Sequence, residues 1–290
     1  MYRQKLLPLL LLAQLATAES LPLISNEAKH CLKPDICATV SVTSINSADP
    51  ALNKFADGLL NSAADAETAE LYRFDKLDKA GLEAWIKRIA TAELNAATVP
   101  NNDYSFDYVI SQAGESEHYR VLRFFIRSYT GGAHGIASAQ FYVLPKSGEL
   151  KPVKLDDILL PHQRGRLDKL QEENFRRWLS SDGGEAGPLN EKELKEHFAN
   201  FPFTPNDNWR FDKRGLRFQY GQYEIAPYAM GMPEILVPTA QLTDVVKPEI
   251  LQELASWQDT PPEKDKDDML KATAKPQWRD GEAKASEDSK

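Results

Sequence analysis

The sequence predicts an α+β fold, in which helices pack against an antiparallel sheet. Three consecutive segments, 103–112, 117–129 and 137–144, read as strands, and apolar and polar residues alternate in the first as they do in a half-buried strand. Segments on either side, 79–96 and 166–179, instead carry apolar residues at helical spacing. Strands that follow one another as a meander, with helices grouped before and after them, are typical of the α+β class.

The chain begins with the form of a secretory signal peptide. Arg3 and Lys5 precede an apolar run from Leu6 to Leu12, and Ala16-Thr17-Ala18 has the small-x-small form of a signal-peptidase site. We expect residues 1–18 to be removed by cleavage near Ala18, which makes the protein periplasmic or secreted. The apolar run is shorter than the roughly 20 residues of a membrane span. No later stretch is apolar enough, so we expect no membrane span.

The two cysteines predict a disulfide. Cys31 and Cys37 enclose the turn signal Pro34-Asp35, and an oxidising compartment favours their pairing. A loop this short contributes only about 2 kcal/mol in the loop-entropy account. The alternative is a redox pair, but the C-x5-C spacing differs from the C-x-x-C of redox motifs. We therefore expect a structural disulfide at the start of a strand over 38–45.

The remaining elements divide into two modules. The N-terminal module, 19–150, contains the strand just named, two helices at 50–61 and 79–96, and the meander, whose most apolar strand is expected inside the sheet. The C-terminal module is expected to span 151–257. Its predicted elements are helical segments at 155–160, 166–179 and 191–198, a hairpin of 209–211 with 216–220, a strand at 234–237 and a closing helix at 248–257.

Residues 258–290 form a charged tail with few apolar side chains, which we expect to be disordered because it buries too little surface to offset its ordering entropy. The chain carries a formal net charge of −8, which becomes −10 once Arg3 and Lys5 leave with residues 1–18. Such a charge disfavours nucleic acid and anionic membranes and favours a basic partner. It also serves the ordinary purpose of solubility.

Two turns carry the most information. The first, Tyr129-Thr130-Gly131-Gly132-Ala133-His134-Gly135, joins two strands of the meander. Its glycines permit positive φ or a close backbone approach. Its histidine either presents chemistry at the surface or fixes the turn by bonding to nearby backbone. The second, residues 223–231, reads Tyr-Glu-Ile-Ala-Pro-Tyr-Ala-Met-Gly and leads into the strand at 234–237.

Together the two turns resemble the RsiV-like family of exported bacterial domains. In that family a strand ends in a Y-x-GGAHG turn, a D…G…L…DIL segment follows, and a YEIAPYA-x-G strand-turn precedes a short I-x-V-P strand. This sequence matches the middle segment with Gly148, Leu150, Leu155, Asp156, Asp157 and Ile158. The resemblance covers residues 38–251 and implies a two-part α+β body.

The resemblance also implies a cell-envelope setting. Relatives include an anti-sigma factor whose outer domain binds lysozyme and a module beside a peptidoglycan deacetylase. We find here neither the transmembrane and sigma-binding segments of the first nor the deacetylase domain of the second, so those activities are not carried over. The expected function is a soluble, non-enzymatic periplasmic protein that binds an envelope ligand, either peptidoglycan or a basic wall hydrolase such as lysozyme.

One candidate binding surface combines residues of both turns. Its members are Tyr129, Gly131, Gly132, His134, Gly135, Tyr223, Glu224, Pro227 and Tyr228. Exposed tyrosines beside a proline-fixed turn suit the recognition of proteins or sugars. The alternative is that Tyr220, Tyr223 and Tyr228 pack as a sheet face with their hydroxyl groups satisfied at the rim. The residue types leave both open.

A metal-assisted hydrolase, acting on glycan or peptide through His134, is the alternative function. The five histidines form no H-E-x-x-H motif, so zinc would need ligands from distant segments, such as Glu224. A G-x-S-x-G elbow is absent. The adjacent Asp156 and Asp157 do not share a face and are better explained as acids at a helix start. We therefore expect no catalytic residue, metal or cofactor.

Overall fold

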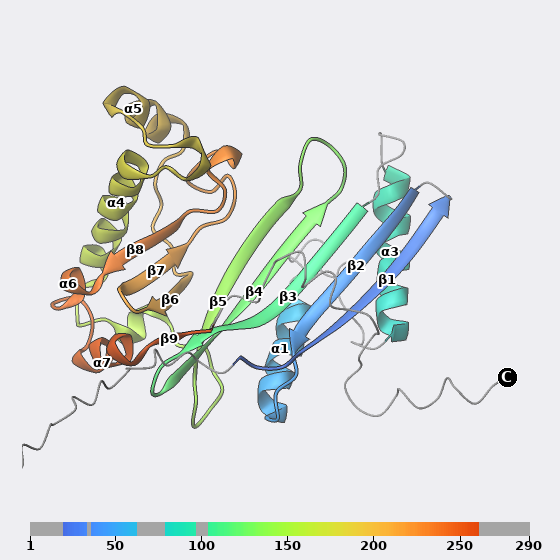
Figure 1. The fold of residues 1–290 in the computed structure, drawn as a ribbon, viewed down its shortest axis with the longest axis horizontal. Helices are drawn as coiled ribbons and strands as arrows, with labels where there is room; N and C mark the ends of the chain where they lie inside the picture. The colour runs from blue at the N-terminus through green and yellow to red at the C-terminus, as the bar shows by residue number, and fades with distance from the viewer. Residues whose placement is uncertain (1–19, 34–35, 63–78, 97–103, 261–290) are drawn as a thin grey trace, which may run out of the picture.

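The computed structural model describes residues 20–33, 36–62, 79–96 and 104–260. They form a large sheet and a small sheet, each accompanied by helices (Figure 1), which confirms the predicted α+β class. Within these ranges no helix is both long and apolar enough to cross a membrane. The expected signal peptide, the Pro34-Asp35 turn and residues 261–290 of the tail lie outside the described residues.

The large sheet has the strand order β1-β2-β3-β4-β5. The strands are β1 (Leu23–Lys33), β2 (Ile36–Ile45), β3 (Tyr104–Glu115), β4 (Tyr119–Tyr129) and β5 (Ile136–Pro145). Strands β2 and β3 run parallel, and the other neighbours in this order are antiparallel. The sheet is therefore mixed rather than wholly antiparallel, because the helices between β2 and β3 form a crossover that returns the chain in the same direction.

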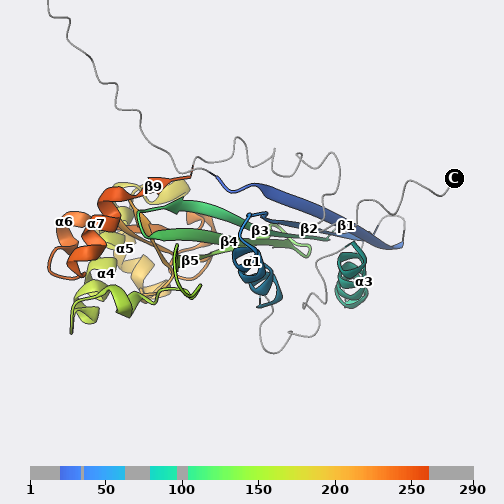
Figure 2. The same ribbon diagram turned by 90° about the horizontal axis from the view of Figure 1, so that it is seen from below.

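Two helices, α1 (Pro50–Ser62) and α3 (Lys79–Ala96), cover one face of this sheet (Figure 2). Both correspond to predicted helices. The buried Trp85 of α3 meets the rings of Phe106 and Tyr108 edge-on, with centroids 5.8 and 5.7 Å apart. Three other expected core positions of α3 have side chains outside the described part of the chain: Leu82, Ile89 and Leu94.

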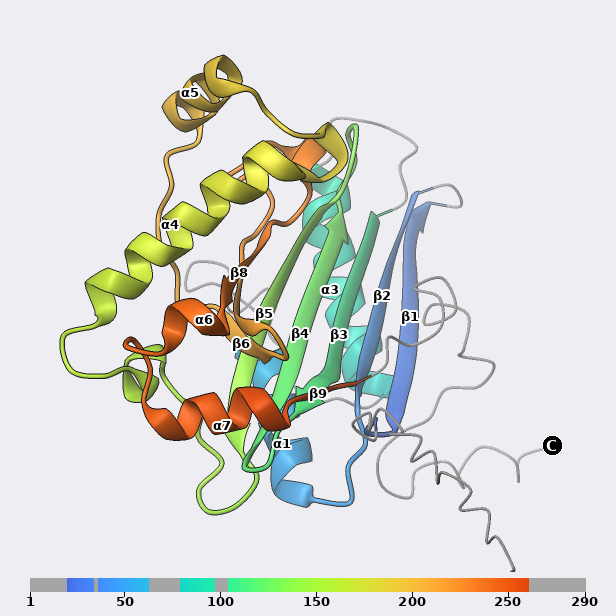
Figure 3. The same ribbon diagram turned by 60° about the vertical axis from the view of Figure 1, so that its left-hand side comes forward.

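The C-terminal elements build the small sheet and its cover. In chain order they are η1 (Leu155–Ile158), α4 (Arg164–Ser181), η2 (Gly184–Ala186), α5 (Glu191–Asn200), β6 (Trp209–Asp212), β7 (Gly215–Gln219), η3 (Tyr228–Met230), β8 (Glu234–Pro238), α6 (Thr239–Leu242) and α7 (Pro248–Ser256). The strands pair antiparallel in the order β6-β7-β8, and α4 crosses beside them (Figure 3). The three strands and η1, α4, α5 and α7 match predicted elements to within about two residues, whereas η2, η3 and α6 were not predicted.

Neighbouring residues of β4 and β5 face two different cores. Leu122 and Leu144 pack with α1 and α3, whereas Val121 and Val143 pack with the small sheet and its helices. All four are buried, at 2 % exposure or less. Because successive side chains of a strand point to opposite faces, one hairpin serves both cores. The hairpin, which lies within the N-terminal module expected at 19–150, thus contributes side chains to both cores.

Side chains from the C-terminal part satisfy the outer edge of β5. Asn208 accepts a hydrogen bond from Phe141 N at 2.8 Å and donates one to Ala139 O at 2.6 Å. Further along, Gln222 Oε1 accepts from Ala137 N at 2.7 Å. These bonds use edge groups that would otherwise be free to pair with another chain. They also fix the segments before β6 and after β7 to the hairpin.

The ordered body extends past the boundary that we expected after residue 257. Gln258–Asp259 form a short strand, β9, which pairs antiparallel with Gly114 and Glu115 of β3. Thr260 N then donates to Ala113 O at 3.0 Å. Figure 3 shows β9 running from the end of α7 to β3. Trp257, which is 2 % exposed, buries its ring against this pairing.

Strand β1 was not expected as a strand. It pairs antiparallel with β2, and Cys31 lies directly opposite Cys37, to which it is joined by the predicted disulfide. An edge strand buries few side chains, so its sequence lacks the apolar alternation by which strands are predicted. In β1, Ala28 is buried, but most of its neighbours are not. The disulfide thus closes a hairpin of β1 and β2.

Glu253 clamps α7 to the turn between β3 and β4. Its carboxylate, on a residue only 4 % exposed, accepts hydrogen bonds from Ser116 Oγ at 2.6 Å and His118 N at 3.1 Å, and lies 2.6 Å from His118 Nδ1. Burial alone would raise the pKa of Glu253, but these bonds outweigh burial and lower the pKa. The hydrogen bond to Glu253 in turn raises the pKa of His118.

Replacing Gly114 with Ala is expected to lower the free energy of unfolding by about 1–3 kcal/mol. A Cβ at this position would lie 2.6 Å from Gln258 O and overlap the Trp257 ring, so backbone would have to move. The control is Gly58→Ala in α1, where an added Cβ meets nothing within 4 Å and should stabilise by about 0.5–1 kcal/mol. Equal effects of the two changes on urea unfolding would contradict the packing of Trp257 on β3.

The Glu253 clamp predicts a pH-dependent contribution to stability. The His118 pKa is raised above 6.5, so its contribution is complete below pH 6.5 and is lost as the pH rises through the folded-state pKa. The Glu253 pKa is lowered below 4.5, so its contribution is complete above pH 4.5 and is lost as the pH falls through the folded-state pKa. The loss of unfolding free energy caused by His118→Gln should therefore be largest between pH 4.5 and 6.5.

The measurement is denaturant unfolding of both proteins from about pH 4 to 8.5. His30→Gln, on β1 and remote from α7, controls for the removal of a histidine elsewhere in the chain. A difference between wild type and His118→Gln that stays constant across the range would show that the ring is not held as a charged partner of Glu253.

Candidate functional site

The β4–β5 turn is built by its glycines and by Tyr129. Gly131 and Gly132 have φ angles of 90° and 92°, where residues with side chains are strained. The Tyr129 hydroxyl donates a hydrogen bond to Gly132 O at 3.0 Å, which closes the turn. At Gly135 a Cβ would lie only 2.6 Å from Ser128 O. The turn therefore holds His134 in a defined position at its exposed tip.

His134 joins this turn to residues 223–231. Its Nε2 lies 3.1 Å from the Tyr223 hydroxyl, and its ring stacks on Tyr228 with centroids 3.7 Å apart and planes 16° apart. Its Nδ1 lies 3.2 Å from Gly135 O. A carbonyl oxygen only accepts, so Nδ1 carries the proton in the neutral ring and Nε2 accepts from Tyr223. The hairpin tip and the orange segment with η3 lie toward the same end of the molecule (Figure 1).

Tyr223 has a left-handed backbone with φ of 64°, which costs a residue with a side chain about 1 kcal/mol or more. The turn imposes this conformation: Glu224 Oε2 accepts from Gly221 N at 2.7 Å, and Glu224 N donates to Gly221 O at 3.4 Å. On the other side, Gln222 is bonded to Ala137 of β5. Between these fixed neighbours the Tyr223 side chain is directed to solvent, and the residue is 47 % exposed.

Tyr228 is supported from beneath. Pro227 precedes it at the start of η3, and Ile225 and Ala226 are fully buried. The carbonyl of Ile225 accepts a hydrogen bond from His197 Nε2 of α5 at 2.9 Å. Burial lowers the pKa of His197, which keeps this ring neutral near physiological pH. The segment that carries Tyr228 is therefore anchored in the C-terminal core.

We call His134, Tyr223 and Tyr228 the aromatic ledge. Their ring centroids lie 3.7 to 6.1 Å apart, and the planes are tilted by 36° or less. Ile136, two residues after His134, is 57 % exposed and extends the apolar surface. Rings that are exposed but held in place present apolar area with little entropy left to lose on binding. The ledge can thus stack on a sugar or an apolar side chain and offers polar edges for hydrogen bonds.

The expected site residues divide by role. Three form the ledge, and the other six shape the two turns: Tyr129, Gly131, Gly132, Gly135, Glu224 and Pro227. Tyr220 behaves differently. It is fully buried, its hydroxyl donates to Gln171 Oε1 at 2.9 Å, and burial raises its pKa. Of the two interpretations of the aromatic segment, packing thus describes Tyr220 and exposure describes Tyr223.

The acidic residues that we considered for catalysis have structural partners. Asp156 accepts from Arg164 Nη1 at 3.1 Å, and Asp157 accepts from Lys154 N at 3.3 Å. In the part of the chain that the structure describes, no group of three or more His, Cys, Asp or Glu side chains is placed to hold a metal ion. The alternative of a metal-assisted hydrolase through His134 and Glu224 therefore finds no ligand set among these residues.

Sequence reasoning did not single out three residues that position the ledge: His197, Gln222 and Ile136. His197 has no motif around it, and its partner is a backbone carbonyl 28 positions away. Gln222 acts through a single acceptor oxygen, and several kinds of polar side chain carry such an oxygen. Ile136 carried one usable signal, since an isoleucine next to a glycine turn is unusual at an exposed position.

Comparisons with known proteins give a family for part of the chain and a fold for most of it. Residues 156–240 match the family model described as "Protein of unknown function (DUF3298)". This segment contains Tyr223 and Tyr228 but not the β4–β5 turn. No curated protein matches the chain.

Two solved structures are similar in fold. One is a DUF3298 family protein from Pseudomonas aeruginosa PAO1, with 19 % identity and a TM-score of 0.58 over 80 % of this chain and 97 % of that one. Another is a DUF3298 family member from Bacteroides fragilis NCTC 9343, with 21 % identity and a TM-score of 0.56 over 83 % of this chain and 100 % of that one. The chain thus carries a DUF3298 domain match at 156–240 within a fold shared with solved DUF3298 proteins.

Proposed function

We propose that this protein is a non-enzymatic binding protein whose recognition surface is the aromatic ledge. Tyr223 is the observation that carries the proposal. Its backbone is held in a conformation that glycine would adopt without strain, and its ring is nevertheless placed in solvent against His134. Strain of this kind persists where the surrounding structure imposes it, and it gathers at functional sites. Packing alone gives no reason to keep a large ring there.

The ligand that we propose is a component of the cell envelope, either peptidoglycan or a basic wall hydrolase such as lysozyme. The signal-peptide form of residues 1–18 and the resemblance to RsiV-like domains support this setting. The disulfide between Cys31 and Cys37 is consistent with an oxidising compartment. Periplasmic or secreted location is part of the same proposal.

The two ligand classes make different demands on the ledge. A glycan would place the apolar face of a sugar on the exposed rings, with contacts that depend little on salt. A basic protein would also be drawn by the net charge of −8, so its association would weaken as ionic strength rises. The salt dependence of binding therefore separates the two classes, whichever residues of the ledge make the contacts.

The variant Tyr223→Gly tests the proposal most directly. Glycine accepts φ near 64°, so relief of strain offsets the greater freedom of the unfolded chain and stability should change by no more than about 1 kcal/mol. Binding should weaken at least tenfold, because a central aromatic anchor contributes about 2 kcal/mol or more. Calorimetric titration against lysozyme and against soluble peptidoglycan fragments, at about 50 and 300 mM salt, measures this.

Leu32→Ala is the matched control, since Leu32 is also an exposed large apolar residue, at 36 %, but lies on β1. It should leave affinity unchanged. The proposal fails if wild-type protein binds neither ligand at about 100 µM. The ledge fails as the site if Tyr223→Gly binds as tightly as wild type.

A further inference from the structure

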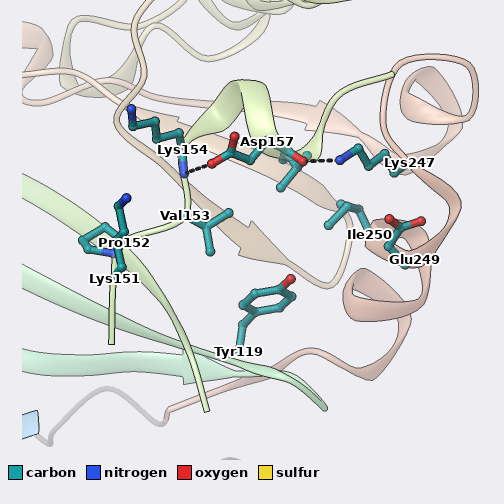
Figure 4. A pocket seen from close by; sticks show the side chains of 10 residues that line it. Tyr119, Lys151, Pro152, Val153, Lys154, Asp157, Lys247, Glu249 and Ile250 are labelled. Carbon is teal, nitrogen blue, oxygen red and sulfur yellow. Dashed lines mark hydrogen bonds between the residues drawn. The ribbon is translucent and has the colours of Figure 1, made fainter. Parts of the chain in front are cut away.

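A pocket of about 470 Å³ lies where the large sheet, the 151–158 segment and α7 meet (Figure 4). Its lining includes Tyr119 at the start of β4, Val153 and Asp157 from the connecting segment, and Glu249 and Ile250 from α7. The volume falls within the range of roughly 300–1,000 Å³ typical of small-molecule sites. None of the residues of the aromatic ledge contributes to it.

The walls of this pocket are tied to one another. Lys247 Nζ donates to Asp157 O at 2.7 Å, and Lys247 N donates to Ile158 O at 2.9 Å. Val153 N donates to Val143 O of β5 at 2.9 Å. The clamp of Glu253 holds α7, one turn after Glu249, against the sheet. These bonds fix the 151–158 segment and α7 to each other and to the large sheet.

The pocket is lined by three lysines, Lys151, Lys154 and Lys247, and by two acidic residues, Asp157 and Glu249. In Figure 4, Lys151 and Lys154 lie on one side and Glu249 lies on the other. Among the described residues, neither lysine has an acidic side chain within ion-pair distance, and Glu249 has no cationic one. These charges are available to a ligand, whereas the ammonium group of Lys247 already donates a hydrogen bond to the backbone carbonyl of Asp157.

Between the charges the lining is apolar, with one hydroxyl group. Val153, Ile158 and Ile250 supply methyl groups, and Tyr119 directs its ring into the space (Figure 4). Burial and the nearby Glu253 and Glu249 raise the pKa of Tyr119, so the hydroxyl stays protonated and can donate. The lining carries charges of both signs. A ligand with one charged end of each sign can meet Lys151 and Lys154 at one end and Glu249 at the other, which neither a phosphate nor a purely apolar ligand can do.

We propose that this pocket binds a small zwitterion, an amino acid or short peptide with free ends and small apolar side chains. The carboxylate lies toward Lys151 and Lys154, and the ammonium group lies toward Glu249. The side chains contact Val153 and Ile250, and the Tyr119 hydroxyl donates to the ligand backbone. Such an arrangement satisfies both charges of the ligand and needs no further ion.

Alanyl-alanine, as the L,L and D,D stereoisomers, is the probe. Titration of the intact chain should shift the backbone amide resonances of Val153 and Ile250 saturably, with a Kd of about 1 mM or tighter for at least one stereoisomer. N-acetyl-alanyl-alanine lacks the ammonium group and alanyl-alaninamide lacks the carboxylate. Each should bind roughly tenfold more weakly, the loss of one charge-assisted contact.

Two variants test the two ends separately. Glu249→Gln should weaken binding of the dipeptide roughly tenfold and leave binding of its N-acetyl form unchanged. The double change Lys151→Gln and Lys154→Gln should do the same for the carboxylate end. Lys169→Gln, an exposed lysine of α4, is the control. All positions are at the surface, and thermal unfolding checks that the fold is kept.

The proposal is overturned if neither stereoisomer shifts these resonances at about 10 mM. It is also overturned if both capped forms bind as well as the free dipeptide, or if Lys169→Gln weakens binding as much as Glu249→Gln. Because Tyr223→Gly leaves this pocket intact, failure here and failure of the aromatic ledge are separate results.

Discussion

One β-hairpin, β4–β5, packs against two hydrophobic cores and thereby joins the N-terminal helices to the C-terminal small sheet. Alternate residues of its strands point to opposite sides of the sheet, so Leu122 and Val121 belong to different cores although they are adjacent in the chain. On one side lie α1 and α3, and on the other lies the small sheet with its helices. Where both faces are covered, at Val121–Leu122 of β4 and Val143–Leu144 of β5, apolar residues therefore occupy consecutive positions.

The same hairpin positions both surfaces proposed for binding. Its tip carries His134, and its edge holds Gln222, so the turn with Tyr223 is fixed with respect to the tip. Its base carries Tyr119, which lines the pocket beneath α7. Neither surface belongs to a single module. The ledge joins a segment outside the DUF3298 match to a segment inside it. The solved DUF3298 structures likewise share the fold of most of the chain, not of residues 156–240 alone.

Periodicity and turn chemistry predicted most of the elements, because apolar spacing and glycine or proline signals are local. What could not be predicted depends on long-range pairing. The parallel register of β2 on β3 is decided by where the crossover helices pack, and β1 carries few apolar residues because it is an edge strand. β9 depends on Trp257, whose partner Gly114 lies far away in sequence.

The candidate site shows the same limit. The sequence indicated His134, Tyr223 and Tyr228 through two turns. Their convergence, however, depends on hydrogen bonds made by the side chains of Gln222 and His197, and neither residue belongs to a sequence motif. The pocket beneath α7 has no sequence signal, since its lysines and Glu249 are ordinary surface residues until the fold brings them together. Resemblance to a family located the turns, and geometry assigned their separate roles.

Because both cores share the β4–β5 hairpin, the body should unfold as a single cooperative unit. Native-state hydrogen exchange at increasing denaturant measures this through the amides of β4, β5 and β7. We expect the slowest amides of all three strands to exchange through the same opening reaction, with a free energy equal to that of global unfolding. If the amides of β7 exchanged while those of β4 and β5 stayed protected, this expectation would be contradicted, because the small sheet would then unfold independently of the hairpin.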